Sequence, residues 1–131
     1  MTDRGEIEAL VRRLCAARVA GDMDVLRRGY ADNATFRIVG SPAWGALTAP
    51  LTGHARIMSR FESMIANLAL SDFAIVDLFV NGNKAAVRWR ATVRHAETKD
   101  DSTTEIAQFL EVEHGQVISL VEFLDTAMAM K

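Results

Sequence analysis

The sequence predicts an α+β protein in which three N-terminal helices pack on one face of a curved antiparallel β-sheet. Apolar residues recur every three or four positions in the first half of the chain, which is the period of amphipathic helices. The second half is rich in β-branched and aromatic residues, and short polar turns divide it into four segments. Helices and strands that are separated along the chain in this way are typical of the α+β class.

The composition is that of an ordinary globular protein. The chain has 131 residues, 50% hydrophobic and 24% charged, with a formal net charge of −2. This length predicts a single domain over residues 1–131. The balanced charge gives no reason to expect a nucleic-acid partner, and no apolar run approaches the ~18–20 residues of a membrane span. With one cysteine and no metal-ligand or phosphate-loop motif, we expect a cytoplasmic protein without metal or cofactor.

Three helices are expected in the first half of the chain. The first covers residues 5–18, with Asp3 and Glu6 as a capping box. The second begins after Asp22, a candidate N-cap, and the third runs from about His54 to Leu68. The apolar stripe of the first helix consists of Ile7, Leu10, Val11, Leu14 and the stem of Arg18.

A short strand is expected at Ala34–Val39, and a long loop follows at Gly40–Gly53. Loops of this length are often functional, and Trp44 within it is a candidate lid over a binding site or a simple packing residue. Hairpin turns then separate the four strands of an antiparallel meander. These strands are expected at Phe73–Val80, Lys84–Ala96, Thr103–Glu113 and Gln116–Ala127.

Alternation along the second strand of the meander leaves two arrangements open. Val87 and Trp89 share one face of this strand, whereas Arg88 and Arg90 share the other. In one arrangement the apolar face packs on the helices and the arginines face solvent. In the other, a second copy of the chain covers the apolar face and the arginines point toward the helices. The neighbouring strands are apolar on both faces, which favours a covered outer face and therefore a homodimer.

Three segments resemble the nuclear transport factor 2-like superfamily, whose members include ketosteroid isomerase, limonene epoxide hydrolase and the SnoaL-like polyketide cyclases. The resemblance covers nearly the whole chain in the right order. It implies a cone-shaped, cystatin-like fold, open at one end and usually homodimeric, with a pocket for a small apolar molecule. The segments are Gly21-Asp22-Met23-Asp24 with Tyr30–Phe36, Leu51–Ile57, and Val121–Thr126.

The resemblance to ketosteroid isomerase does not extend to its catalytic residues. The position of the carboxylate base falls at Ile38, and those of the two oxyanion donors fall at Leu14 and Gln108. A further cavity tyrosine falls at Phe61. An isoleucine cannot take a proton and a leucine cannot donate a hydrogen bond, so steroid isomerisation by that mechanism is not expected.

The resemblance to limonene epoxide hydrolase keeps two of five catalytic positions. Arg90 and Asp125 match members of the Asp–Arg–Asp triad, and the other aspartate falls at Thr92. The positions of the water-holding tyrosine and asparagine fall at Phe36 and Ile38. Both resemblances place Arg90 inside the cone, which favours the inward arrangement of the arginines.

We therefore expect Arg90 and Asp125 to form the catalytic or ligand-anchoring pair. An arginine in an apolar cone needs a carboxylate partner, and pairing of the first and last strands of the meander would supply Asp125 or Glu122. The register of the last strand stays open, with either Glu122 and Leu124 or Phe123 and Asp125 inside. Further ligand-binding candidates are Tyr30, Trp44, Met58, Phe61, Arg88, Gln108 and Glu122.

Two classes of function follow from these expectations. The first is a SnoaL-like or ketosteroid-isomerase-like enzyme that isomerises or hydrolyses a small apolar molecule without a cofactor. The second is a non-catalytic ligand-binding or dimerisation module, in which a buried ion pair only closes the core. The fold alone does not decide between them.

Overall fold

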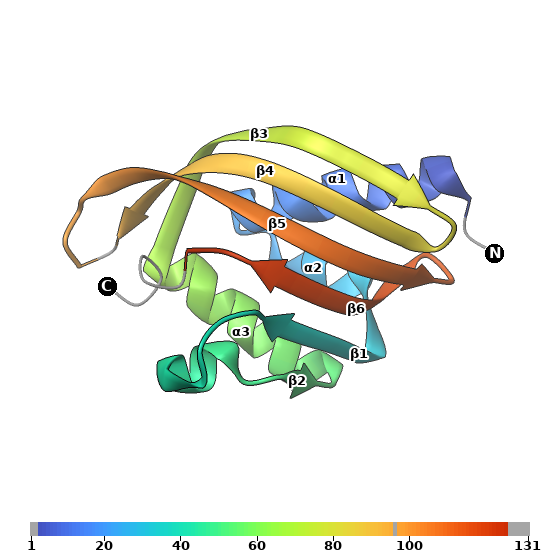
Figure 1. The fold of residues 1–131 in the computed structure, drawn as a ribbon, viewed down its shortest axis with the longest axis horizontal. Coiled ribbons are helices and arrows are strands. Elements are labelled where there is room, and N and C mark those ends of the chain that lie inside the picture. The colour runs from blue at the N-terminus through green and yellow to red at the C-terminus, as the bar shows by residue number, and fades with distance from the viewer. Residues whose placement is uncertain (1–2, 96, 126–131) are drawn as a thin grey trace.

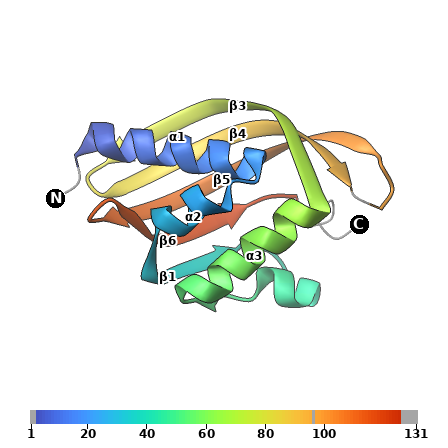
Figure 2. The same cartoon turned by 180° about the vertical axis from the view of Figure 1, so that it is seen from behind.

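The computed structural model describes residues 3–95 and 97–125, and within this part the side chain of Trp44 is not described. Three helices cover one face of a six-stranded sheet, as Figures 1 and 2 show from opposite sides, and the predicted α+β class is confirmed. In chain order the elements are α1 (Arg4–Ala20), α2 (Met23–Gly29), β1 (Tyr30–Ile38), the 3-10 helix η1 (Pro42–Thr48), β2 (Leu51–Thr52), α3 (His54–Asn67), β3 (Leu68–Asn81), β4 (Lys84–His95), β5 (Asp101–Glu113) and β6 (Gln116–Phe123).

The first two helices begin where their capping residues place them. The Asp3 side chain accepts a hydrogen bond from the backbone N–H of Glu6 at 2.8 Å, which caps α1. Asp22 caps α2 in the same way, through the N–H of Val25 at 3.3 Å. The predicted loop at 40–53 is more ordered than expected, because it contains η1 and the short strand β2.

The sheet is mixed rather than purely antiparallel. Its strand order is β2-β1-β6-β5-β4-β3, and β3 to β6 form the predicted antiparallel meander. β1 is longer than expected and pairs in parallel with β6. This pairing occupies the edge of β6, so the expected contact between the first and last strands of the meander is wrong: β3 lies at the opposite edge of the sheet.

The side chains of β4 settle which face packs on the helices. Val87 and Trp89 are buried in the core, and Trp89 is fully inaccessible. Arg88 and Arg90 are exposed on the outer face, so the prediction that they point into the cone is wrong. Burial of the large apolar indole favours this orientation, and the arginines keep their hydration outside. Arg88 also forms ion pairs there with Asp77 at 2.7 Å and Glu105 at 3.0 Å.

The outer face of the sheet carries the large exposed apolar side chains of the described residues. Phe79 is 66% exposed, Phe109 52% and Phe123 42%. The rings of Phe109 and Phe123 meet edge to face, with their centroids 5.8 Å apart. Among the described residues, no helix combines the length and the apolar character that crossing a bilayer requires.

Candidate functional site

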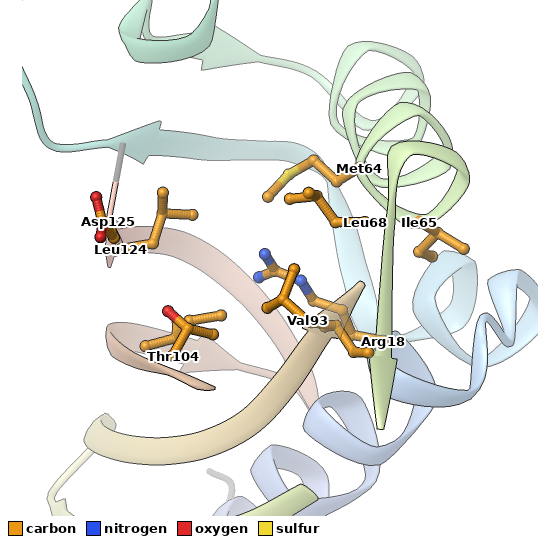
Figure 3. A pocket seen from close by; sticks show the side chains of 10 residues that line it. Arg18, Met64, Ile65, Leu68, Val93, Thr104, Leu124 and Asp125 are labelled. Carbon is orange, nitrogen blue, oxygen red and sulfur yellow. The ribbon is translucent and has the colours of Figure 1, made fainter. Parts of the chain in front are cut away.

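A small, mostly apolar cavity lies between α3 and the inner face of the sheet (Figure 3). Its volume is about 30 Å³, which is room for roughly two water molecules. Three of its lining residues have polar side chains: Arg18, Thr104 and Asp125. The other lining residues are Met64, Ile65, Leu68, Leu70, Val93, Ile106 and Leu124.

Arg18 is the charged group at the inner end of this cavity. It lies in the last turn of α1, on the same face as Val11 and Leu14, and only 5% of it is exposed. Figure 3 shows its side chain entering the cavity beside Val93. The helical period therefore carries a guanidinium into the core along with the apolar stripe.

A carboxylate on β6 neutralises this buried charge. Arg18 Nη1 donates to Glu122 Oε1, and Arg18 Nη2 donates to Glu122 Oε2 at 2.9 Å. Glu122 is completely buried and accepts a third hydrogen bond from Gln108 Nε2 at 2.8 Å. The Cys15 thiol completes the chain by donating to Gln108 Oε1 at 3.6 Å. A bidentate ion pair of this kind neutralises the charge of the guanidinium and also fixes its orientation.

Two aromatic rings contact the guanidinium of Arg18. The guanidinium carbon lies 5.8 Å from the ring centroid of Phe61 and 5.6 Å from that of Trp89. Phe61 packs in turn against Tyr30 and Phe36, each with a centroid distance of 5.3 Å. These cation–π contacts and the bidentate ion pair with Glu122 restrict the guanidinium to one position.

The electrostatics of the cluster follow from burial and from the ion pair. Burial alone would lower the pKa of Arg18, but the charge and hydrogen bonds of Glu122 outweigh it and raise that pKa. Burial raises the pKa of the Cys15 thiol to about 12, and it also raises the pKa of Tyr30. Arg18 therefore stays charged, while the thiol and the phenol stay neutral at ordinary pH.

The structure brings most of the predicted cavity residues together. Tyr30, Met58, Phe61, Gln108 and Glu122 are all buried in the interior. Their burial does not test a role in ligand binding, which stays a prediction.

The structure also decides the register of the last strand. Glu122 is the inward residue, whereas Phe123 is exposed on the outer face. Asp125 follows the end of β6 and lines the cavity, although the residue is largely exposed.

The predicted pairing of Arg90 with Asp125 is not what the structure shows. Arg90 and Arg88 lie on the outer face of the sheet, and Asp125 lines a cavity on the inner face. Because a side chain of β4 reaches only one face, Arg90 cannot serve the cavity from its observed position. The prediction for Trp44 as a lid concerns a side chain outside the described residues.

Sequence reasoning missed Arg18 as a site residue. Its position in the apolar stripe of the first helix was visible, but only its aliphatic stem was assigned to the core. A charged residue at a buried helical position is itself a signal, because such a charge needs a partner. The partner, Glu122, lies 104 residues away in the sequence.

The described residues hold no group of three or more His, Cys, Asp or Glu side chains that could bind a metal ion. What the site offers is a fixed hydrogen-bond donor, a carboxylate at the opposite wall and apolar surface between them. This donor set suits the orientation of a small molecule with one polar end.

A cone of three helices on a curved mixed sheet, with polar side chains inside, defines the class of nuclear transport factor 2-like proteins. Within this class, residues 11–120 match the model of the SnoaL-like domain, so the chain belongs to the SnoaL-like domain family. None of the curated proteins matches the sequence.

Solved structures show the same fold at low sequence identity. A nuclear transport factor 2-like protein of unknown function from Burkholderia pseudomallei is 15% identical with a TM-score of 0.81, and the match covers 95% of each chain. Another such protein, from Burkholderia xenovorans, is 20% identical with a TM-score of 0.76, covering 99% of this chain and 97% of that one. An LEH-like epoxide hydrolase from Mycobacterium tuberculosis is 13% identical with a TM-score of 0.76, and the match covers 96% of this chain and 87% of that one. At these identities the likeness concerns the fold.

Proposed function

We propose that the cone binds a small, largely apolar molecule and that Arg18 orients a hydrogen-bond acceptor of this ligand. The observation that carries the proposal is a buried guanidinium in the wall of an otherwise apolar cavity. An arginine has five N–H donors, and the hydrogen bonds to Glu122 use two of them. A carbonyl, ether or hydroxyl oxygen in the cavity would accept a charge-assisted hydrogen bond from the others.

The charge balance favours a neutral ligand. Glu122 already compensates the charge of Arg18, and Asp125 adds a negative charge at the cavity wall. An anionic ligand would therefore meet two carboxylates and one arginine in a medium of low dielectric. A neutral molecule with an oxygen at one end avoids this repulsion.

Ligand entry requires the walls to move. The cavity of about 30 Å³ is far smaller than the ~300 Å³ at which drug-sized sites begin. Ile65, Leu68 and Leu124 line it and are only half-buried, so these side chains have the room to swing outward. We expect a ligand of few heavy atoms, bound with displacement of these residues.

Catalysis is a second function that one observation favours. Asp125 is the carboxylate among the lining residues, whereas Glu122 is fully enclosed and holds three hydrogen bonds. Asp125 is therefore the group placed to take a proton from a ligand or from water, with Arg18 polarising the ligand oxygen. This arrangement would support isomerisation or hydrolysis without a cofactor. The alternative is a non-catalytic module. In a ligand-binding module the same site would bind without turnover, and in a dimerisation module the buried ion pair would only close the core.

The test is a titration of the protein with small neutral epoxides, lactones and enones. Changes in the NMR chemical shifts of the cavity residues measure the binding. Truncation of Arg18 alone would leave Glu122 buried and unpaired, so the informative variant is the double substitution Arg18→Met/Glu122→Gln. We expect binding to be lost in this variant and kept in Arg90→Gln, whose arginine lies on the outer face. Equal binding in the double variant and the native protein would exclude Arg18 as the anchor.

Turnover of the same compounds tests the catalytic alternative. Asp125→Asn should abolish turnover while leaving binding measurable, because the amide keeps the size of the side chain but cannot take the proton. Binding without turnover in the native protein would assign a binding module instead.

We further propose that the outer face of the sheet joins two copies of the chain. The exposed rings of Phe79, Phe109 and Phe123 support this proposal, because large apolar groups gathered on one face favour burial. The cytoplasmic location and the single domain over residues 1–131 stay predictions.

A further inference from the structure

A second, larger hollow lies on α3, outside the cone. Its volume is about 390 Å³, compared with about 30 Å³ for the cavity, and the two share no lining residue. It is lined by Leu51 of β2 and by five residues of α3 that recur at helical spacing on one side of the helix. These five residues are Ala55, Arg56, Ser59, Arg60 and Ser63. We call this surface the α3 groove.

Arg60 is the fixed cation of the α3 groove. Its Nη1 donates to the carbonyl oxygen of Leu47 at 2.8 Å, and its Nη2 donates to that of Ala46 at 2.6 Å. These bonds hold the guanidinium against η1, which lies beside α3 in Figure 2. They use two of its five N–H donors. Burial lowers the pKa of Arg60, and no carboxylate of the described residues forms an ion pair with it.

Arg56 places a second positive charge one helical turn before Arg60. It is exposed and has no ion-pair partner within the described part of the chain. Glu62, the acidic residue of α3, pairs instead with Arg27 of α2 at 3.4 Å. The positive charges of Arg56 and Arg60 repel each other, because they lie one helical turn apart. None of the residues that line the α3 groove is acidic. The groove is therefore a concave surface with two uncompensated guanidinium groups.

We propose that the α3 groove binds a phosphate monoester, with the phosphate between Arg56 and Arg60. Guanidinium groups donate parallel N–H bonds that match the spacing of phosphate oxygens. The hydroxyls of Ser59 and Ser63 supply further donors on the same side of the helix. Leu51 and Ala55 give the organic part of the ester an apolar wall. The α3 groove is shallow and open to solvent, so the ester would be bound at the surface of the helix and covered on one side only.

The experiment is a calorimetric titration of the whole protein with phenyl phosphate at low ionic strength. We expect saturable binding that weakens roughly tenfold in Arg56→Gln, the loss of about one charge-assisted hydrogen bond. Arg56 is exposed, so this variant should fold normally, which thermal unfolding verifies. Arg12→Gln, which removes an exposed arginine from α1, is the matched control and should bind like the native protein.

The absence of saturation would overturn the proposal. So would an equal loss in Arg12→Gln, which would mean that only the overall charge matters. Inorganic phosphate is the second probe, and it should bind more weakly than phenyl phosphate because it leaves the apolar wall unused. Equal affinity for both would overturn the ester and identify free phosphate as the ligand. Arg60→Lys keeps the positive charge but removes the planar guanidinium group, so it should also weaken the binding of phenyl phosphate.

Discussion

Arg18 Nη2 lies 2.9 Å from Glu122 Oε2, and the other prong of the pair joins Arg18 Nη1 to Glu122 Oε1. The two residues come from the last turn of α1 and from β6, so the ion pair ties the helical layer to the sheet. The arginine is 5% exposed and the glutamate is completely buried. Neither charge can turn to water if its partner is removed.

Removal of one partner should therefore destabilise the protein more than removal of both. We expect Arg18→Met or Glu122→Gln alone to lower the free energy of unfolding by about 3–5 kcal/mol, because each leaves a buried charge unpaired. The double variant removes both charges and should lose less than either single variant. Urea unfolding of the four proteins measures the coupling. If the two single losses simply add, the pair has no energetic coupling and this account of the core is wrong.

Cys15 should make the protein less stable in alkali. Burial raises its pKa from 9.0 to about 12, so the folded protein keeps the thiol proton that the unfolded chain loses above pH 9. The contribution is fully present below pH 9 and is lost as the pH rises toward 12, at about 1.4 kcal/mol per pH unit. Tyr30, whose pKa is also raised, should steepen the loss above pH 10.

Comparison of the native protein with Cys15→Ala isolates the contribution of the thiol to the pH dependence of stability. Urea unfolding from pH 8 to pH 11 should show a shallower decline in the variant, whatever its stability at pH 8. Alkylation of the native protein supplies a second measurement, because only a thiolate reacts and Cys15 is buried. Rapid labelling of the folded protein at pH 8 would contradict the raised pKa.

Local patterns in the sequence were sufficient for the helices and for the strands of the meander. Caps such as Asp3 and Asp22 act within one turn, so the sequence near them contains the signal. The parallel pairing of β1 with β6 was not predicted, because its partners lie far apart in the chain and no turn connects them.

The candidate site was predicted less well, for a reason visible in β4. Alternation separates Arg88 and Arg90 from Val87 and Trp89, but the same alternation fits either face of the sheet. Packing of Trp89 against the helices decides the matter, and it depends on the whole fold. The prediction that Arg90 pairs with a carboxylate at the end of the chain was therefore wrong, and the buried ion pair joins Arg18 to Glu122 instead.

Gly29 allows a close approach of α2 to α1. A Cβ atom added at this position would lie 2.4 Å from Cδ2 of Leu14, a buried side chain that would have to shift. We expect Gly29→Ala to cost about 1–3 kcal/mol of stability through overpacking. Gly5→Ala is the matched control within α1, because its Cβ would lie at an ordinary 3.5 Å from Asp3 Oδ1. It should stabilise the protein by up to about 1 kcal/mol. Equal stability of the two variants in urea would show that the contact at Leu14 relaxes freely.

The outer face of the sheet should hold two copies of the chain together through its exposed phenylalanines. Phe109 lies on β5 and touches Phe123 of β6 edge to face, so a charge at this position interrupts the apolar face near its middle. We expect Phe109→Lys to convert a dimer into a monomer without loss of helix or strand content, because the side chain is 52% exposed in one copy. Light scattering after size-exclusion chromatography measures the mass, and circular dichroism verifies the fold. Ala66→Lys adds a charge of the same sign to an exposed position of α3, away from the outer face of the sheet, and should leave the dimer intact. A native protein that is monomeric at high micromolar concentration would overturn the proposed interface, and dissociation by Ala66→Lys as well would assign the effect to charge alone.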